Sequence, residues 1–271
     1  MTSPRSAPVA AASKLTKRSF REQQRRFLAE GPQAVREALG VPGGVLTLFA
    51  TGEAAGRHGD LVSAASSAGA TVHRVSGQAM ATLTGTVTPQ GLVAVCPFVD
   101  VPVATILAAP PALGVLLAQV RDPGNAGTVV RVADAAGAGA VLFGHGSVDA
   151  YNGKCVRASA GSLFHLDLAV DVDLSDTVAA LRAAGVRVLA ADGAGSGDLD
   201  DLIDAGTLAA PTVWMFGNEA WGMPEAVRAL ADEVVRVPIH GRAESLNLAT
   251  AAAVCLYASA RAQRREPGGR T

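Results

Sequence analysis

Short apolar segments that alternate with helix-like segments restrict the fold of this chain more than any other feature of its sequence. Strands are expected at residues 45–50, 71–75, 92–98, 113–120, 140–143, 186–191, 212–216 and 234–239. Helices are expected between them, at residues 60–68, 78–83, 128–136, 174–184, 224–231 and 246–261. Strands that alternate with helices predict α/β layers with largely parallel sheets.

Prolines indicate where one domain ends and the next begins. Four of them fall in the stretch PFVDVPVATILAAPP, which ends at residue 111. We therefore expect a linker at residues 99–111, between a small α/β domain of residues 14–98 and a second α/β domain of residues 112–264. A basic helix is expected at residues 14–28, and disordered tails are expected at residues 1–13 and 265–271.

Composition excludes several classes of protein. Hydrophobic residues make up 49% of the chain and the mean hydropathy is +0.28, which excludes global disorder. The three cysteines, Cys96, Cys155 and Cys255, form no CxxC pair and have no histidine at metal-ligand spacing, so we expect reduced core residues and no metal site. The chain has no apolar run of membrane-spanning length and no signal-peptide core, which predicts a cytoplasmic protein with no membrane partner.

Charge is distributed unevenly along the chain. Residues 1–37 hold eight basic side chains and three acidic ones, a net charge of +5, so the rest of the chain carries −6 of the total of −1. A basic front on an acidic body is typical of a protein that contacts a polyanion at one end. A solvated, charged helix explains the same pattern equally well.

Three strand exits in the second half carry glycine and polar residues, and ligands of open α/β sheets bind beyond the carboxyl ends of strands. The first exit, QVRDPGNAGTVVR, holds Asn125 and Arg131. Both also have structural interpretations, because asparagine can cap a helix and Arg131 can pair with Asp134 along it. These structural interpretations are favoured while this loop is considered alone.

The other two exits add an acid, a serine and a second asparagine. Gly217 and Glu219 follow the apolar strand at residues 212–216, where glycine allows a close approach to the backbone and an acid suits a helix start. Ser245 and Asn247 precede the C-terminal helix, which Ser245 could cap. Asn247 is harder to explain by helix propensity, because asparagine is a poor helix former.

Taken in order, the motifs NxGTVVR, FGNExxGM and VPIxGxxESLN resemble those of the SpoU/TrmH family of RNA 2′-O-ribose methyltransferases, which belongs to the SPOUT superfamily. The resemblance covers about residues 115–261. The segment RSFREQQRRFLAEG and the βα alternation that follows it also resemble the ribosomal-protein-like RNA-binding domain often fused to such enzymes.

This resemblance implies a fold, an activity and partners. The expected fold is a SPOUT α/β-knot domain, with a deep trefoil knot near its C-terminus, preceded by a small α/β RNA-binding domain. The expected activity is transfer of a methyl group from S-adenosylmethionine to a ribose 2′-hydroxyl, without a metal, by a homodimer. The separate RNA-binding domain favours large-subunit (23S) rRNA over tRNA as the substrate.

Motif by motif, the resemblance also implies site residues. The expected catalytic residues are Asn125, Arg131, Glu219, Ser245 and Asn247. The expected cofactor-binding residues are Gly217, Val237, Ile239 and Leu246. The expected RNA-binding residues are Arg18, Arg21, Arg25, Arg26 and, from the segment ASAGSLF, Ser159, with Gly161 and Ser162 beside it. The sequence HGR at residues 240–242 departs from the smaller, less charged stretch of many relatives, which leaves the RNA contacts of that loop open.

Arg131 needs a chemical role that its pKa allows. A guanidinium has a pKa above about 12, so it is a poor proton acceptor for a ribose hydroxyl. We therefore expect Arg131 to stabilise the developing alkoxide and to bind the adjacent phosphate, across a dimer interface in one version of the hypothesis.

Three alternatives remain open. The substrate could be tRNA, or the chain could be a non-catalytic RNA-binding protein built on a decayed enzyme. The glycine-rich segment LAADGAGSG at residues 189–197 could be the phosphate loop of a Rossmann-type enzyme. Against that last reading, too little chain follows the segment to complete such a fold, and acidic residues crowd the start of the next helix.

Overall fold

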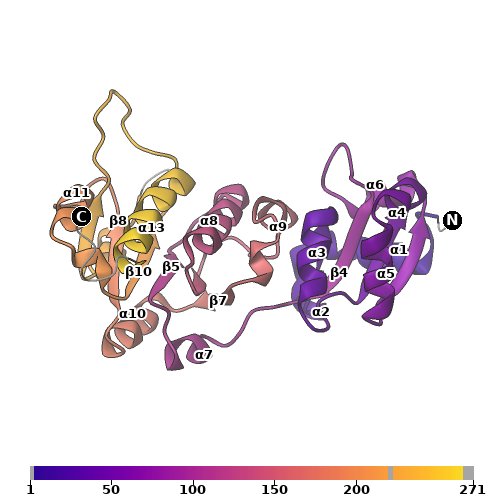
Figure 1. Ribbon diagram of the computed structural model, residues 1–271, viewed down its shortest axis with the longest axis horizontal. Coiled ribbons are helices and arrows are strands. Elements are labelled where there is room, and N and C mark those ends of the chain that lie inside the picture. The colour runs from indigo at the N-terminus through magenta and orange to yellow at the C-terminus, as the bar shows by residue number, and fades with distance from the viewer. Residues whose placement is uncertain (1–2, 219–221, 265–271) are drawn as a thin grey trace. The chain divides into compact units, whose positions relative to one another are not determined.

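The computed structural model describes residues 3–218 and 222–264, and the chain divides into two compact units (Figure 1). The N-terminal unit comprises residues 1–99 and 149–165. The C-terminal unit comprises residues 100–148 and 166–271. Each unit contains its own sheet, and together they confirm the expected α/β class.

A four-stranded sheet forms the centre of the N-terminal unit. Across the sheet, the strands follow the order β1 (Arg26–Glu30), β4 (Leu92–Pro97), β2 (Thr47–Thr51) and β3 (Thr71–Val75). β4 runs antiparallel to both β1 and β2, and only β2 and β3 are parallel. The prediction of a largely parallel layer is therefore wrong for this unit, because β4 inserts between β1 and β2 in the opposite direction.

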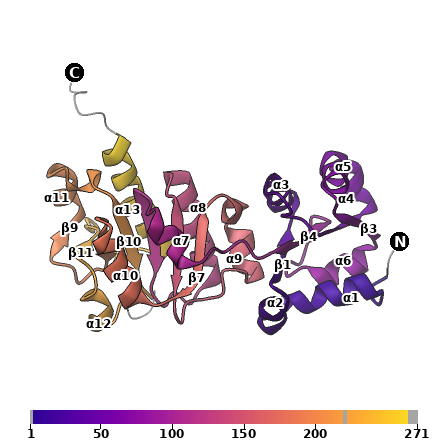
Figure 2. The same cartoon turned by 90° about the horizontal axis from the view of Figure 1, so that it is seen from below.

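Helices cover both faces of this sheet. They are α1 (Ala7–Ser13), α2 (Arg18–Gln24), α3 (Pro32–Gly40), α4 (Gly52–Arg57), α5 (Gly59–Ser67) and α6 (Gly77–Leu83), with a short 3₁₀ helix η1 (Lys14–Thr16). Figure 2 shows α1 and α6 on one face and α3 and α5 on the other. The core between α1, α6 and the sheet includes Val9, Phe49, Met80 and Val93.

Residues 7–13 form helix α1, whereas the sequence predicted a disordered tail at residues 1–13. Pro8 lies in the first turn of α1, where its fixed φ favours a helix. Val9 and Ala12 lie three residues apart on one side of this helix and are buried against the sheet. The apolar spacing was present in the sequence but too short to be recognised.

The composition of residues 14–28 predicted one basic helix, but the segment does not form one. After η1 and α2, Arg25 adopts a left-handed conformation with φ of 51° and turns the chain into β1. In β1, Phe27 and Ala29 are buried while their neighbours are less so, which is the two-residue period of a strand. Pairing with β4 overrides the helical propensity of this stretch.

Residues 149–165 belong to the N-terminal unit although they follow residue 112 in the sequence. They form α9 (Gly153–Ala158) and the 3₁₀ helix η2 (Ser162–Phe164). Their aromatic rings pack on β1, since the Tyr151 and Phe164 rings lie 4.8 Å and 5.9 Å from that of Phe27. The observed units thus differ from the predicted division, in which each domain is one continuous stretch.

A seven-stranded sheet forms the centre of the C-terminal unit. The strands are β5 (Leu113–Leu117), β6 (Ala140–Gly144), β7 (Asp167–Val172), β8 (Arg187–Ala191), β9 (Gly197–Asp198), β10 (Thr212–Phe216) and β11 (Glu233–Arg236). Their order is β7-β6-β5-β10-β8-β11-β9, and every pair is parallel. The late strand β10 therefore inserts between β5 and β8, and the carboxyl ends of all these strands lie along one edge.

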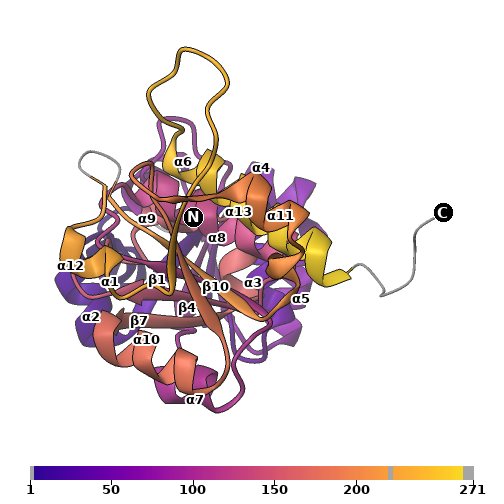
Figure 3. The same ribbon diagram turned by 90° about the vertical axis from the view of Figure 1, so that its left-hand side faces the viewer.

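Helices cover both faces of this sheet as well. They are α7 (Val103–Ala108), α8 (Pro123–Ala136), α10 (Leu174–Ala183), α11 (Leu199–Asp204), α12 (Glu225–Arg228) and α13 (Leu248–Arg264), with a 3₁₀ helix η3 (Thr207–Ala209). Figure 3 shows α7 and α10 on one side of the sheet and α8 and α13 on the other. α7 lies inside the segment that was predicted to be a linker.

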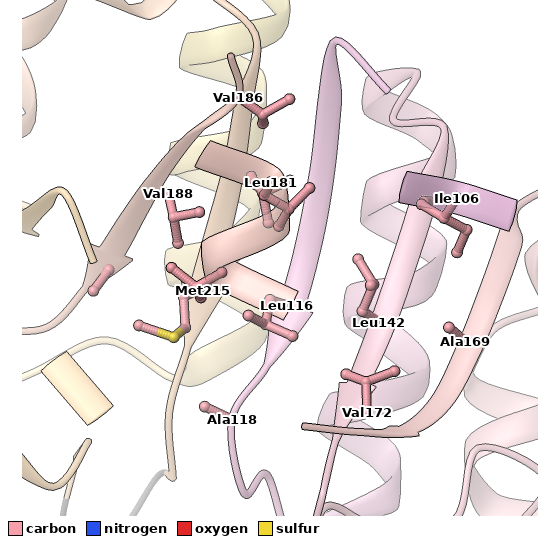
Figure 4. Packing of buried hydrophobic residues seen from close by; sticks show 14 of the residues in the cluster. Ile106, Leu116, Ala118, Leu142, Ala169, Val172, Leu181, Val186, Val188 and Met215 are labelled. Carbon is pink, nitrogen blue, oxygen red and sulfur yellow. The ribbon is translucent and has the colours of Figure 1, made fainter. Parts of the chain in front are cut away.

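Apolar side chains of the central strands fill the space under α7 and α10. Leu116, Leu142, Val188 and Met215 come from four neighbouring strands and meet Leu181 of α10 in one buried layer (Figure 4). On the other face, the buried Trp214 donates its indole N–H to the Ser259 hydroxyl of α13 at 2.9 Å. This packing fixes the level at which the strands end and the loops begin.

No helix within residues 3–218 and 222–264 is both long and apolar enough to cross a membrane. In the same part of the chain, His, Cys, Asp and Glu side chains form no group of three or more that could hold a metal ion.

Candidate active site

A cavity of about 320 Å³ opens at the carboxyl edge of the C-terminal sheet, where β8, β10 and β11 end. Its walls come from the ends of these strands, from the loop that joins β11 to α13, and from the start of α13. This loop extends well away from the sheet (Figure 1). The volume lies within the range of about 300–1,000 Å³ that is usual for sites of small molecules.

The four residues predicted to bind the cofactor all line this cavity. Gly217 follows β10, Val237 and Ile239 follow β11, and Leu246 precedes α13. Ser245, one of the predicted catalytic residues, lies on the same wall and is exposed. The structure therefore brings together the second and third of the three strand exits.

Gly217 allows close packing within the protein. A Cβ atom at this position would lie 2.1 Å from Cγ of Met223 and 3.1 Å from its backbone nitrogen. The glycine thus allows the segment after residue 222 to fold back against the end of β10, where Asn218 and Gly222 also form a β-bridge. It thereby shapes the cavity wall, and the close approach of a ligand to its backbone stays a prediction.

Asn125 does not cap the helix that contains it. α8 begins at Pro123, and its N-cap is Asp122, whose carboxylate accepts a hydrogen bond from the Asn125 backbone N–H at 2.7 Å. The Asn125 side chain is therefore not required at the helix start. The interpretation of Asn125 as the N-cap of this helix is therefore excluded.

Asn247 links the first and third strand exits. Its side-chain amide donates to Oδ1 of Asn125 at 3.1 Å, and its own Oδ1 accepts from the Ala249 backbone N–H at 2.9 Å. Since α13 begins at Leu248, Asn247 precedes the helix and does not lie inside its first turn. This position removes the conflict with helix propensity, and the amide pair connects the cavity loop to the start of α8.

Arg131 is exposed on α8 and makes no hydrogen bond or ion pair with any residue in the described ranges. It follows Asn125 by six residues, which places it about 9 Å further along the helix axis and on a different side. It does not pair with Asp134, the structural role considered above. A single chain therefore does not bring Arg131 to the Asn125–Asn247 pair.

Glu219, the remaining predicted catalytic residue, lies outside the described residues.

The predicted RNA-binding residues of the N-terminal unit differ widely in exposure. Arg18 and Arg26 are exposed, and Arg18 pairs with Glu22 at 2.6 Å. Arg25 is also exposed and lies over the Phe98 ring, 4.5 Å from its centroid. These three arginines remain accessible for contact with a nucleic acid.

Arg21 and Ser159 are buried, which corrects their prediction as RNA-contacting residues. Arg21 is 4% exposed, pairs with Asp149 at 2.5 Å and donates to the carbonyls of Leu15 and Thr16. Ser159 is fully buried, and its hydroxyl donates to the Val156 carbonyl at 2.8 Å. Both side chains stabilise the N-terminal unit from inside.

The glycine and serine next to Ser159 are also part of this packing. A Cβ at Gly161 would lie 2.4 Å from Cγ of Glu37, and the φ of Gly161 is +99°. Ser162 is 7% exposed. The segment ASAGSLF therefore has the small residues that its close contact with α3 requires.

Asp192 is a cavity residue that sequence reasoning did not select. It follows β8, and its carboxylate accepts from the backbone N–H groups of Ala194 at 2.9 Å and Met223 at 3.2 Å. Nη1 of Arg228 lies 3.5 Å from Oδ1 of Asp192. Asp192 lies at a strand exit like the other candidate residues. The glycines that follow it resemble a phosphate loop, which favoured a different interpretation of this segment.

The glycines after Asp192 pack against a strand, which excludes a phosphate loop at this point. A Cβ at Gly195 would lie 2.6 Å from the Val234 carbonyl oxygen, and Gly197 begins β9, which pairs with β11. Gly193, in contrast, lines the cavity, and a Cβ there would meet nothing within 4 Å.

Two family descriptions match the chain. Residues 112–257 match the SpoU rRNA methylase family, and residues 8–94 match the MRM3-like substrate binding domain. The first match covers more than half of the chain and includes all three motif loops.

Individual relatives agree with this assignment. The chain is 34% identical over 244 residues to the 23S rRNA (guanosine(2553)-2′-O)-methyltransferase RlmP of Bacillus subtilis, which covers 90% of this chain and 92% of that protein. It is 42% identical over 164 residues to the 23S rRNA (uridine(2479)-2′-O)-methyltransferase of Streptomyces viridochromogenes, a match that covers 59% of this chain and 55% of the relative.

Solved structures show the same architecture. The AdoMet-bound rRNA methyltransferase from Sinorhizobium meliloti is similar with a TM-score of 0.83 and 32% identity, covering 96% of this chain and 97% of that one. The SpoU methyltransferase AviRb from Streptomyces viridochromogenes, in complex with AdoMet, is similar with a TM-score of 0.79 and 30% identity, covering 94% and 98%. This chain belongs to the SpoU rRNA methylase family.

Proposed function

We propose that this chain transfers a methyl group from S-adenosylmethionine (AdoMet) to a ribose 2′-hydroxyl of 23S rRNA. The observation that carries the proposal is the meeting of the three motif loops at one sheet edge. Gly217 and Ser245 line one cavity, and Asn247 next to that cavity bonds to Asn125. The relatives named above methylate 23S rRNA at the 2′-oxygen of different nucleosides.

The chemistry of the cavity fits AdoMet. Phe216, Val237, Ile239 and Leu246 supply apolar surface for a flat purine ring. The carboxylates of Asp192 and Glu244 line the same cavity and can accept hydrogen bonds from hydroxyl and ammonium groups. The open space beside the Gly193 backbone leaves room for a ligand where a side chain would intrude.

AdoMet, when bound, supplies a methyl group on a positively charged sulfur that leaves readily. The chain itself must then hold the ribose oxygen in line with that methyl group, a type of positioning that can lower a barrier by about 7–11 kcal/mol. Asn125 and Ser245 would orient the ribose, and Asn247 would hold Asn125 in place through its amide.

Arg131 would act through its positive charge, since its guanidinium stays protonated and cannot serve as the base, so the 2′-hydroxyl proton passes to solvent water as the methyl group is transferred. Its side chain is exposed and unengaged within the described residues, so it can reach a phosphate or the developing alkoxide. Because Arg131 faces away from Asn125 along α8, we assign this role to the Arg131 of a second subunit in a homodimer.

We also propose that the chain forms a homodimer, that it contains the trefoil knot implied by the family, and that it is located in the cytoplasm. Val254 and Tyr257 of α13 are 40% and 54% exposed, which supplies apolar surface for a second copy. The cytoplasmic location follows from that of the ribosomal RNA substrate.

Sedimentation equilibrium tests the dimer. Mixing Arg131→Ala subunits with Asn125→Ala subunits tests a shared site, because mixed dimers should regain activity at one of their two sites.

The decisive experiment measures transfer of tritium from labelled AdoMet to purified 23S rRNA and to total tRNA. Incorporation into 23S rRNA as an alkali-resistant ribose methylation is expected. Incorporation into tRNA alone would move the substrate to tRNA, and incorporation into neither, with AdoMet bound, would favour a non-catalytic RNA-binding protein. Failure to bind AdoMet would contradict the proposal as a whole.

A comparison of Arg131→Ala with Arg131→Lys tests the proposed role of Arg131. Arg131→Ala should lose nearly all turnover, and Arg131→Lys should recover little of it, because a lysine cannot reproduce the two-pronged contact of a guanidinium. Nearly full activity in Arg131→Lys would show that only a positive charge is needed.

A further inference from the structure

His145 and Asp171 form an exposed pair at the same sheet edge as the cavity. Nδ1 of His145 lies 2.7 Å from Oδ1 of Asp171, and the two side chains are 82% and 70% exposed. His145 directly follows β6, and Asp171 lies near the end of β7. With Nδ1 facing the carboxylate, Nε2 of the ring remains directed away from the pair and available to another molecule.

The backbone at Asp171 is unusual. The register of the two strands shifts so that Phe143 pairs with Val170 and Gly144 with Val172, which leaves Asp171 as an extra residue in β7. Asp171 has a φ of 56°, a left-handed conformation that residues other than glycine rarely adopt. Bulges and strained residues of this kind concentrate next to active sites.

Stability does not explain this arrangement. Exposed ion pairs contribute little to folding, because water screens the charges and two side chains lose their freedom. An extra residue in a left-handed conformation costs stability. The bulge nevertheless aims the Asp171 carboxylate at His145 and fixes the imidazole ring above the sheet edge.

Hydrogen bonds connect the His145 loop to the first motif loop. The Ser147 hydroxyl donates to the Leu117 carbonyl at 2.9 Å, and the Val148 N–H donates to the Val120 carbonyl at 2.8 Å. A Cβ at Gly146 would lie 3.9 Å from the Gln119 side chain. Gln119 itself has a φ of 58°, and its carbonyl accepts from Asn218 of the cavity wall at 3.3 Å.

Strand order places the pair on the side of Asn125 that is opposite to the cavity. From the cavity, the edge runs from β10 to β5, whose exit carries Asn125, and then to β6, whose exit carries His145. Neighbouring strands are about 4.8 Å apart, so the exits of β5 and β6 are adjacent along this edge. An RNA strand whose methylated ribose lies at Asn125 can therefore extend along the edge toward His145.

We propose that His145, oriented by Asp171, binds the sugar–phosphate backbone of the nucleotide next to the methylated ribose. Its Nε2 hydrogen-bonds to a backbone oxygen and fixes the direction in which the RNA strand crosses the sheet edge. Arg121, exposed on the β5 exit beside this loop, adds positive charge along the same path. The inference rests on the proposed RNA methyltransferase function.

The test uses the full chain and a 23S rRNA fragment that the wild-type protein methylates. His145→Ala should raise the Kd for this RNA about 3- to 10-fold, in keeping with loss of one hydrogen bond in an interface. His145→Gln should regain part of the affinity, and Asp171→Asn should lose about 2- to 3-fold. The Kd for AdoMet and the melting temperature should stay unchanged in all three.

Asp167→Asn is the matched control, because Asp167 is an exposed carboxylate at the opposite end of β7. It should leave RNA affinity at the wild-type value. An RNA Kd for His145→Ala equal to that of Asp167→Asn would overturn the inference while the methyltransferase function stands. A wild-type protein that neither binds nor methylates the RNA would overturn both.

Discussion

The two units use the same residue types in opposite ways. In the N-terminal unit, Arg21 is buried, with its guanidinium engaged by Asp149 and two carbonyls. In the C-terminal unit, Arg131 is exposed and has no partner within the described ranges. Ser159 and Ser245 show the same contrast, since the first is buried on a carbonyl and the second lines the cavity.

This contrast shows that residue type does not distinguish a structural from a functional side chain. Burial of a charged group is tolerated only where partners compensate for lost hydration, so removal of a fully satisfied arginine or serine leaves its buried partners uncompensated. Polar side chains left exposed at the ends of strands serve no such purpose. Variants of Arg21 and Asn125 test whether the N-terminal residues are structural and the C-terminal ones functional.

Removal of Arg21 should have the largest effect. Arg21→Ala leaves the Asp149 carboxylate, only 13% exposed, without its counter-charge, and should lower the free energy of unfolding by about 3–5 kcal/mol. Urea unfolding followed by circular dichroism measures this loss. Arg18→Ala is the control, because its pair with Glu22 is mostly exposed and should contribute at most about 0.5 kcal/mol. Equal effects of the two variants would remove the contrast.

Removal of Asn125 should reduce activity and leave stability unchanged. Asn125→Ala breaks the bond to Asn247 and should lower kcat about 100-fold, which corresponds to about 2.7 kcal/mol, through misplacement of the ribose. Thr128→Ala, which removes a hydroxyl bond to Gly124 on the same helix, should keep activity within about 3-fold. A large fall in melting temperature for Asn125→Ala would make this residue structural after all.

Two buried serines allow a comparison of structural hydrogen bonds between the units. Ser259→Ala in the C-terminal unit leaves the Trp214 indole N–H without a partner and should cost about 1–3 kcal/mol of unfolding free energy. Ser159→Ala in the N-terminal unit should also lower the free energy of unfolding, because Val156 lies in the last turn of α9, where carbonyl groups lack donors within the helix. Chemical denaturation of both variants measures the two losses, and an unchanged free energy of unfolding for Ser159→Ala would contradict a structural role for this hydroxyl.

The smallest effect concerns two buried cysteines, one in each unit. Burial raises the pKa of the Cys255 thiol to about 12 and raises that of Cys96 well above its usual value. The folded protein therefore keeps these protons while the unfolded chain loses them above about pH 8.5, so stability should fall as the pH rises. The expected decrease between pH 8 and pH 9 is of the order of 1 kcal/mol.

Cys255→Ala and Cys96→Ala should each reduce the slope of stability against pH in this interval. Unchanged slopes in both variants would contradict the assignment of the pH dependence to the thiols.

Local patterns predicted the C-terminal unit better than the N-terminal one. The strands at β8 and β10 and the long apolar helix α13 followed from periods within single segments. β1 did not, because its helical composition yields to pairing with β4, which is far away in the sequence. The place of residues 149–165 also depends on long-range contacts, such as those of Tyr151 and Phe164 with Phe27.

The strand-exit rule and the motif resemblance selected Gly217, Val237, Ile239 and Leu246 as expected cofactor-binding residues, and all four line one cavity. Asp192 was missed because its loop resembled a phosphate-binding segment. Arg21 was misassigned because a sequence gives its charge but not its neighbours, and the Asp149 carboxylate lies 128 residues away.

The return of the chain at residues 149–165 limits how this protein can be recombined. A graft of the first 99 residues onto another methyltransferase would omit α9, η2 and the carboxylate that neutralises Arg21. The recipient would receive a module with Phe27 uncovered and a buried cation without its counter-ion. A functional chimaera must therefore transplant both pieces together, so the substrate-binding part cannot be exchanged as a simple cassette, and its inheritance is tied to that of the enzyme.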